Sequence, residues 1–216
     1  MAQNGPIRVF LADDHAIVRE GLAALLAGDP RSEIVGQCGD GLKVFEEVRG
    51  SDPDVVVLDI TMPGLNGLDI CREIRNKLRD VQVLILSMHD DEQFIARALR
   101  NGAAGYLFKE GAAEQLIEAV RTVAGGGVYL GPGVPGSVLE QLNGRGQDAY
   151  EKLTTRERQV LQLIAEGKTN RKIAEELNLA VKTVDTHRSR LMQKLRIHDQ
   201  TSLVKYALRK GIVSLG

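Results

Sequence analysis

The stretch DVVVLDITMPGLNG, Asp54 to Gly67, decides the fold of the N-terminal half of the chain. Four apolar residues, Val55 to Leu58, lie between turn-forming residues, which is typical of a strand buried on both faces of a parallel sheet. Asp59 ends the run, and Pro63 and Gly64 follow in the next loop. A carboxylate at the carboxyl end of such a strand lies where open α/β sheets place ligands and reacting groups. The alternative role for it is that of a helix cap or turn former.

The composition indicates a folded protein without metal-thiolate or disulfide chemistry. The chain has 216 residues, of which 43% are hydrophobic, enough for one large or two ordinary domains. Its two cysteines, Cys38 and Cys71, are far apart and lack the paired spacing of a zinc site or a disulfide framework. Neither a leader peptide nor an apolar run of about 20 residues is present, so we expect a cytoplasmic protein without membrane association.

Charge is distributed unevenly along the chain. Residues 1–150 carry a formal net charge of −8 and residues 151–216 carry +7. This asymmetry favours a cation-using or regulatory half joined to a half that binds nucleic acid.

A segment rich in glycine and proline separates the two halves. Residues 125–148 contain eight glycines and two prolines, and loops of this length are uncommon inside compact domains. The sequence therefore predicts an N-terminal domain over residues 1–124, a linker over 125–148, and a C-terminal domain over 149–216.

The N-terminal half alternates apolar strands with amphipathic helices. The strands are expected at residues 7–12, 33–38, 54–59, 81–87 and 104–109. Strict alternation predicts an α/β fold, a doubly wound parallel five-stranded sheet with right-handed crossovers and helices on both faces.

Polar side chains follow four of these strands and should meet at one edge of the sheet. They are the carboxylates of Asp13, Asp14 and Asp59, the hydroxyl of Ser87 and the ammonium of Lys109. Carboxylates packed this closely repel one another unless a cation intervenes, and an all-oxygen cluster suits Mg²⁺. With a metal and an ammonium beside it, a carboxylate can attack a phosphoryl group and hold it as an acyl phosphate.

Two classes of enzyme fit this pattern poorly. A dinucleotide-binding fold needs G-x-G-x-x-G after its first strand, and LADDHAIVREG does not supply it. A hydrolase that works through an aspartyl phosphate usually has a second acid two residues after the nucleophile, where this chain has Thr61. The site is therefore expected to belong to a switch and not to an enzyme.

Four motifs in residues 7–122 together resemble the receiver domain of two-component response regulators, a flavodoxin-like fold. They are ADDH (12–15), VLDITMPGLNG (57–67), LSMHD (86–90) and GAAGYLFKE (102–110). The resemblance implies that a histidine kinase phosphorylates Asp59. It also implies roles for the surrounding residues: Mg²⁺ bound by Asp14, Asp59 and the carbonyl of Thr61, with Asp13 acting mainly through water; phosphoryl contacts from Ser87 and Lys109; and inward rotation of Tyr106 as Ser87 moves.

The sequence departs from the common receiver pattern at one position and contains two histidines near the site. Many receivers have proline after the lysine, whereas Glu110 follows Lys109 here, so a cis peptide is not assumed. His15 and His89 are expected to face solvent, and we assign them no catalytic role.

The C-terminal half is helical and basic. A helix capped by Thr154 or Thr155 should be followed by a short helix from Thr169–Asn170 and by a longer one after Asn178–Ala180. The last two would form a helix-turn-helix pair. Taken alone, the polar face of the longer helix fits an ordinary solvated surface as well as a surface that enters the major groove of DNA.

The segments LTTRERQVLQLIAEGKTNRKIAEEL and VKTVDTHRSRLMQKL resemble the small all-α DNA-binding domain of LuxR-type regulators, over about residues 151–213. By position, the resemblance implies base contacts from Asp185, Thr186 and Ser189, and contacts to phosphates or the groove edge from Lys182, Thr183, His187, Arg190 and Lys194. Asp185 departs from the commoner lysine, and as a hydrogen-bond acceptor it favours the N4 amino group of cytosine.

Both resemblances together indicate a response regulator of the NarL/FixJ type. The expected function is a phosphorylation-controlled transcriptional regulator that binds double-stranded promoter DNA as a homodimer. The alternative is a phosphorylation-independent DNA-binding regulator with a receiver-like interaction domain.

Overall fold

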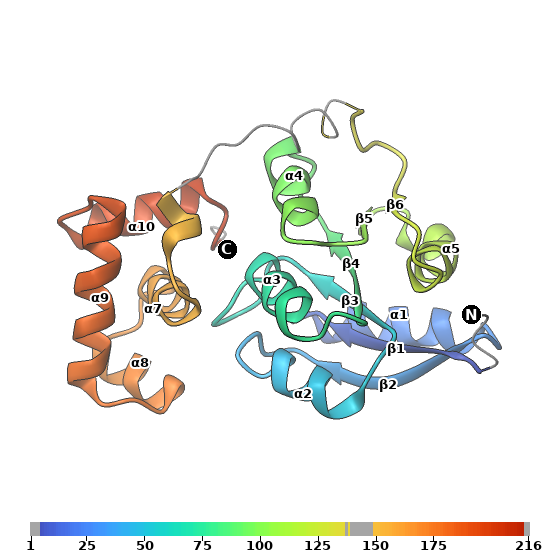
Figure 1. Cartoon of the computed structure of the whole chain (residues 1–216), viewed down its shortest axis with the longest axis horizontal. Coiled ribbons are helices and arrows are strands. Elements are labelled where there is room, and N and C mark those ends of the chain that lie inside the picture. The colour runs from blue at the N-terminus through green and yellow to red at the C-terminus, as the bar shows by residue number, and fades with distance from the viewer. Residues whose placement is uncertain (1–4, 137, 139–148, 214–216) are drawn as a thin grey trace. The chain divides into compact units, whose positions relative to one another are not determined.

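The strand predicted around Val55–Leu58 lies in the middle of a parallel sheet. In the computed structural model, which describes residues 5–136, 138 and 149–213, the chain divides into two compact units, residues 1–144 and 145–216 (Figure 1). The first unit contains the sheet, with strand order β2-β1-β3-β4-β5-β6 and parallel pairing throughout. The strands are β1 (Ile7–Ala12), β2 (Ser32–Cys38), β3 (Val55–Asp59), β4 (Gln82–Ser87), β5 (Gly105–Phe108) and β6 (Tyr129–Leu130).

The sixth strand is a difference from the five-stranded sheet expected from the sequence. Tyr129 and Leu130 pair in parallel with Gly105 and Tyr106, and the backbone N–H of Gly131 donates to the carbonyl of Tyr106 at 2.9 Å. A two-residue strand beside glycines has no detectable periodicity, so the sequence pattern could not show it. It lies within the predicted linker, residues 125–148, and the domain limits themselves stay a prediction.

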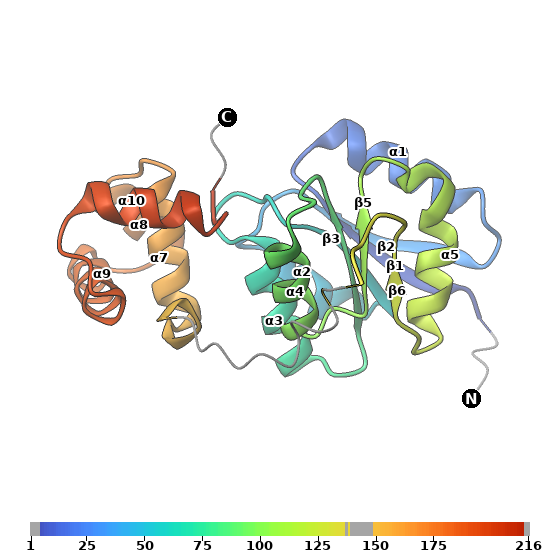
Figure 2. The same cartoon turned by 90° about the horizontal axis from the view of Figure 1, so that it is seen from above.

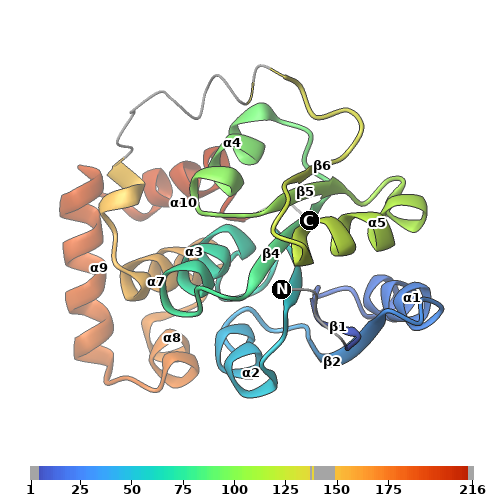
Figure 3. The same ribbon diagram turned by 45° about the vertical axis from the view of Figure 1, so that its right-hand side comes forward.

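Helices cover both faces of the sheet, as strict alternation predicts. α1 (Ala16–Ala27) and α5 (Ala112–Ala124) lie on one face, whereas α2 (Val44–Ser51), α3 (Gly67–Lys77) and α4 (Glu92–Arg100) lie on the other (Figures 2 and 3). The side chains of β3 divide accordingly: Val55 and Val57 pack in the α1/α5 core, and Val56 and Leu58 pack in the opposite core. A strand with a core on each side has no polar face, and this explains its continuous apolar run.

The loop after β3 is packed tightly against the end of the strand. Asn66 caps α3 by accepting a hydrogen bond from the N–H of Asp69, and Gly67 donates its N–H to the carbonyl of Ile60 at 2.8 Å. A Cβ atom at Gly67 would overlap the carbonyl oxygen of Asp59. The loop therefore depends on glycine for the close approach of two backbone segments.

Two glycine substitutions test this packing. Gly67→Ala should lower the free energy of unfolding by about 2–3 kcal/mol, because the backbone of Asp59 cannot move without disturbing β3. Gly21→Ala, in the middle of α1 with open space around it, should raise it by about 0.5–1 kcal/mol. Urea unfolding followed by circular dichroism measures both; equal effects of the two substitutions would contradict the steric argument.

The second unit is helical. It contains the short helix η1 (Ala149–Lys152) and the helices α7 (Thr155–Ala165), α8 (Asn170–Leu177), α9 (Val181–Leu195) and α10 (Gln200–Arg209). Thr154, rather than Thr155, caps α7 in a capping box with Glu157, and Thr169 caps α8. Asn178 has a left-handed backbone (φ 53°) that ends α8 and begins the turn to α9.

The helices of the second unit bury apolar side chains where they contact one another. The predicted inward residues of α9, namely Val184, Leu191 and Leu195, are buried. Apolar side chains of the other helices are buried too, among them Val160, Leu161, Ile164, Ile173, Ala174, Leu177 and Leu203, and α7 contacts α8, α9 and α10. α8 and α9 therefore form the predicted helix-turn-helix pair, supported by α7 and α10. Within the described parts of both units, no helix is long and apolar enough to span a bilayer.

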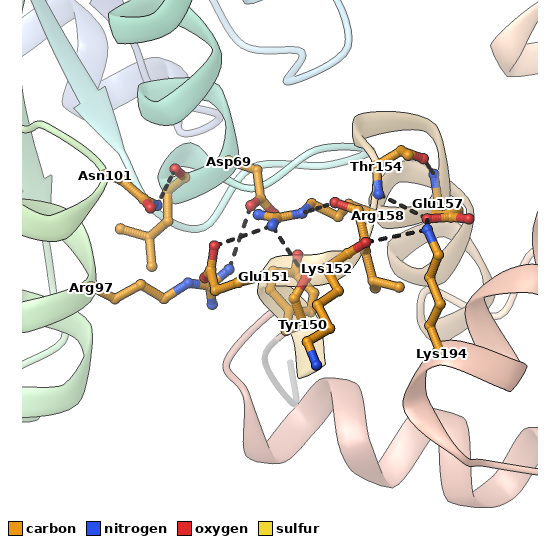
Figure 4. A network of polar contacts seen from close by, with 12 residues as sticks. Asp69, Arg97, Asn101, Tyr150, Glu151, Lys152, Thr154, Glu157, Arg158 and Lys194 are labelled. Carbon is orange, nitrogen blue, oxygen red and sulfur yellow. Dashed lines mark hydrogen bonds and ion pairs between the residues drawn. The ribbon is translucent and has the colours of Figure 1, made fainter. Parts of the chain in front are cut away.

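Arg158 holds the segment that enters the second unit. Its side chain is almost fully buried (1% exposed), and its guanidinium lies 4.5 Å from the centre of the Tyr150 ring (Figure 4). It donates hydrogen bonds to the carbonyls of Leu153 and Tyr150 and contacts Glu151 at 3.3 Å. The Arg158 guanidinium thus links η1 to α7 by hydrogen bonds, and the helical periodicity of the sequence does not predict this contact.

Candidate functional site

Four predicted residues meet at the carboxyl edge of the sheet in the first unit. Asp13 follows β1, Asp59 ends β3, Ser87 ends β4 and Lys109 follows β5. Asp13, Asp59 and Ser87 are buried, with exposed fractions of 2%, 3% and 0%. The parallel register places these strand ends side by side, so residues as distant in sequence as Asp13 and Lys109 form one cluster.

Lys109 is the centre of this cluster. Its Nζ lies 2.7 Å from Oδ2 of Asp13 and 2.9 Å from Oδ2 of Asp59. Burial lowers the pKa of Lys109, but the hydrogen bond with Asp13 and the charge of Asp59 outweigh it, so the pKa lies above its usual value. Lys109 is therefore a fixed cation beside the two buried carboxylates.

The carboxyl group of Asp59 is strongly perturbed. Burial raises its pKa to about 6, although Lys109 and a hydrogen bond from the backbone of Thr61 lower it, and the charge of Asp13 raises it further. A buried carboxylate with one ammonium and a second carboxylate beside it has an incomplete balance of charge. The cluster therefore has room in its charge balance for a further cation.

Asp14 and His15 extend the cluster towards solvent. Ligand atoms of Asp13, Asp14, His15 and Asp59 all lie within 4.8 Å of one another. Nδ1 of His15 lies 2.8 Å from Oδ1 of Asp14, while 63% of the histidine side chain is exposed. The expectation that His15 faces solvent holds for most of the side chain, but its contact with Asp14 was not predicted. The three carboxylates fit a hard cation such as Mg²⁺, which takes oxygen ligands and retains water.

A second group of side chains connects the cluster to β5. Ser87 accepts a hydrogen bond from the N–H of His89 at 3.0 Å, and the hydroxyl of Tyr106 donates to the carbonyl of His89 at 2.8 Å. Nε2 of His89 lies 3.3 Å from the hydroxyl of Thr61, and its ring stacks on Phe94 at 4.4 Å. His89 was expected to face solvent, yet it joins these loops. Tyr106 is fully buried and therefore lies in the inward orientation.

In the second unit, the residues predicted to contact DNA lie on α9, and most of them are exposed. Lys182, Asp185, Thr186, Ser189, Arg190 and Lys194 are exposed, and Thr183 and His187 are partly buried. Thr186 and Ser189 donate their hydroxyl hydrogens to carbonyls one turn earlier, those of Lys182 and Asp185. Their oxygen atoms can still accept hydrogen bonds.

Each of the two units matches the model of a known protein family. The model of the response regulator receiver domain matches residues 9–121, and that of the bacterial regulatory proteins of the luxR family matches residues 151–207. The chain belongs to the NarL/FixJ family of response regulators. Members of this family are DNA-binding transcriptional regulators of two-component systems.

Several named members of the NarL/FixJ family are similar over nearly the whole chain. The oxygen regulatory protein NreC of Staphylococcus carnosus is 40% identical over 96% of this chain and 99% of its own length. The transcriptional regulatory protein DegU of Brevibacillus brevis is 38% identical, with 97% and 96% covered. Among solved structures, a complex of the response regulator RcsB with DNA has a TM-score of 0.58 at 25% identity and covers 94% of this chain and 98% of that one.

Lys194 of this NarL/FixJ regulator has a contact that the sequence did not predict. Its Nζ lies 2.6 Å from Oε2 of Glu157, which is 3% exposed, and donates to the carbonyl of Lys152 (Figure 4). Burial raises the pKa of Glu157, but the hydrogen bonds from Lys194 and Thr154 outweigh it and hold the pKa below its usual value. The predicted groove-edge contact of Lys194 would have to use the remaining ammonium hydrogen.

Binding of Mg²⁺ should depend on pH because of Asp59. Since its pKa is raised to about 6, the carboxyl group is protonated below that pH and the proton competes with the cation. We expect the affinity for Mg²⁺, measured by calorimetric titration at fixed ionic strength, to fall as the pH decreases from 7.5 to 5. Asp59→Asn should bind Mg²⁺ more weakly at pH 7.5 and lose the dependence near pH 6; an unchanged dependence would assign it to another group.

The ion pair of Lys194 and Glu157 should stabilise the helical unit. Lys194→Ala leaves a buried carboxylate without its cation and should lower the free energy of unfolding by about 1–3 kcal/mol at pH 7. Because the pKa of Glu157 is lowered in the folded state, the pair's contribution is present above pH 4.5 and is lost as the pH falls through the folded pKa. The control is Lys182→Ala, an exposed lysine of the same helix, which should change stability by less than about 0.5 kcal/mol in thermal unfolding. Equal losses in the two variants would show that the buried pair contributes nothing.

Proposed function

We propose that a histidine kinase transfers a phosphoryl group to Asp59 and that this modification controls DNA binding through α9. The observation that supports it most strongly is the contact of Lys109 with both Asp13 and Asp59 at the buried edge of the sheet. A cation fixed at this place is suited to the oxygens of a phosphoryl group that has arrived on Asp59.

The chemistry requires the deprotonated carboxylate of Asp59. One of its oxygens forms a bond with phosphorus as the bond from phosphorus to the kinase's histidine nitrogen breaks, and the product is an acyl phosphate. Asp13, Asp14, Asp59 and the carbonyl of Thr61 would hold Mg²⁺, which when bound offsets the negative charge of the entering group.

The network around β5 offers a route for the response. Ser87 and Lys109 would contact the phosphoryl oxygens, and their backbones are already joined, since the N–H of Lys109 donates to the carbonyl of Ser87 at 2.9 Å. Withdrawal of the Ser87 hydroxyl from the N–H of His89 would alter the loop that also accepts the hydroxyl of Tyr106. The modification thus changes the surface beside β4 and β5.

Double-stranded DNA is the partner that we propose for α9. In this reading Asp185, Thr186 and Ser189 face base edges, while Lys182, Thr183, His187, Arg190 and Lys194 lie at phosphates or the groove edge. One small domain has few base contacts, so we propose a homodimer on a site of two half-sites. The structure of two RcsB dimers bound to DNA supports this arrangement. The cytoplasmic location stays a prediction from sequence.

Phosphorylation is tested by labelling the full chain. With Mg²⁺ and a small acyl phosphate, mass spectrometry should show one added phosphoryl group that is labile to hydroxylamine, and Asp59→Asn should abolish it. Asp54→Asn, directly before the same strand, is the matched control and should be labelled normally. Labelling that persists in Asp59→Asn would refute the assignment of Asp59.

The same preparations test control of DNA binding. Affinity for a duplex selected from a random library should increase when the parent chain is phosphorylated and stay unchanged in Asp59→Asn treated identically. Fluorescence anisotropy at one salt concentration measures this. If phosphorylated and unphosphorylated chains bind equally, the protein is the phosphorylation-independent regulator that the sequence left as the alternative.

A further inference from the structure

A side chain of α8 contacts the recognition face of α9. Asn170, the first residue of α8, donates from Nδ2 to Oδ1 of Asp185 at 2.6 Å. The two residues are 15 positions apart, so this is a tertiary contact and not a turn of one helix. Asp185 is exposed and lies one turn before Ser189 on the face that we assign to DNA.

The same asparagine is held from its other side. Nη1 of Arg188 donates to Oδ1 of Asn170 at 3.4 Å, and Nη2 of Arg188 donates to Oε1 of Gln200 in α10 at 3.1 Å. Because a guanidinium can only donate, the amide oxygen must face Arg188 and the amide nitrogen must face Asp185. A chain of three hydrogen bonds therefore orients the carboxylate of Asp185 from two neighbouring helices.

Only one of the two carboxylate oxygens of Asp185 takes part in this contact. Oδ1 accepts from Asn170, whereas Oδ2 has no hydrogen-bond partner among the residues that the structure describes. A carboxylate on an exposed helix normally rotates freely and loses that freedom when it binds. With one oxygen held, the other is presented in a fixed direction before any ligand arrives.

We propose that Asn170 is a positioning residue for sequence recognition, which fixes Asp185 so that its free oxygen accepts a hydrogen bond from the N4 amino group of cytosine in the major groove. This rests on the proposed function, in which α9 reads DNA. Adenine also has an amino group, but its N7 acceptor lies beside it and repels a carboxylate, which can only accept; cytosine has no such neighbour.

The chain of hydrogen bonds could instead only join α8, α9 and α10. In that case loss of Asn170 would lower stability and weaken binding to every sequence alike. A positioning role predicts a different result: loss of Asn170 must alter the base preference at the position in the DNA site that Asp185 contacts. Alanine is tolerated at Asn170, since Thr169 caps the helix and alanine favours it.

The experiment is a selection of duplexes from a random library by the full phosphorylated chain and its variants. The variants are Asn170→Ala, Asp185→Ala, the double variant, and Glu175→Ala. Glu175 is the control because it is exposed on α8 and its side chain pairs, among the residues that the structure describes, with exposed Arg171 alone. Asn170→Ser is a second variant for the case in which alanine disturbs folding, and circular dichroism monitors the fold of each.

Asp185→Ala should remove the preference for cytosine at one position in each half-site, and Asn170→Ala should reduce that preference by about 3- to 10-fold at the same position. The double variant should be no worse than Asp185→Ala, because Asn170 acts through Asp185. Glu175→Ala should leave the preferred sequence unchanged.

The possible failures are distinguishable. If Asp185→Ala changes the preferred base and neither Asn170 variant does, the positioning role is wrong while the proposed function stands. If Asn170→Ala weakens binding uniformly, the contact serves only to join the helices and the inference is overturned. If Asp185→Ala leaves the preference intact, both the assigned reading role and the inference fail.

Discussion

The receiver half depends on the contacts of one partly buried ammonium, that of Lys109. Lys109 lies within 3 Å of Asp13 and Asp59, and without it two carboxylates would be buried side by side. Removal of charges from water is unfavourable unless they are paired, so the strand ends must converge closely enough for one lysine to contact both acids. The parallel pairing of the strands brings the ends of β1, β3 and β5 close enough for this. Even so, burial raises the pKa of Asp59 to about 6, so the ion pair with Lys109 offsets only part of the cost of burying this carboxylate. Two carboxylates thus share one ammonium at the place where a cation and a phosphoryl group are proposed to bind.

Much of the first unit could be predicted from the sequence because its strands are buried on both sides. An apolar run such as Val55 to Leu58 can be recognised as a strand without knowing which strands lie beside it. The topology of alternating strands and helices then brings the strand ends together, and with them Asp13, Asp59, Ser87 and Lys109. His89 could not be placed in this way. Its connections to Thr61 and Tyr106 depend on how the loop after β4 folds, and a loop has no period that a sequence pattern would reveal.

The second unit shows the same limit at its surface. Inward residues such as Val184 and Leu191 follow the helical period, and Thr154 and Thr169 are recognisable caps. The ion pair of Lys194 with Glu157 spans 37 positions, and the contact of Asn170 with Asp185 spans 15. For polar side chains at exposed or edge positions, no periodicity in the sequence predicts which residues they contact. Sequence alone therefore identified which helix presents the polar face but not which of its side chains are already bound within the domain.

The short strand β6 shortens the linker that the sequence predicts between the two units. A linker counted from the end of α5 would begin at Gly125, but hydrogen bonds to Ala104 and Tyr106 keep Tyr129 and Gly131 on the sheet. The span available to the tether is then shorter by the residues from Gly125 to Leu130, roughly 20 Å at full extension. The chain accordingly leaves the sheet after β6, its edge strand, and not after α5. Two residues of backbone pairing thus move the point of departure from a covering helix to the rim of the receiver sheet.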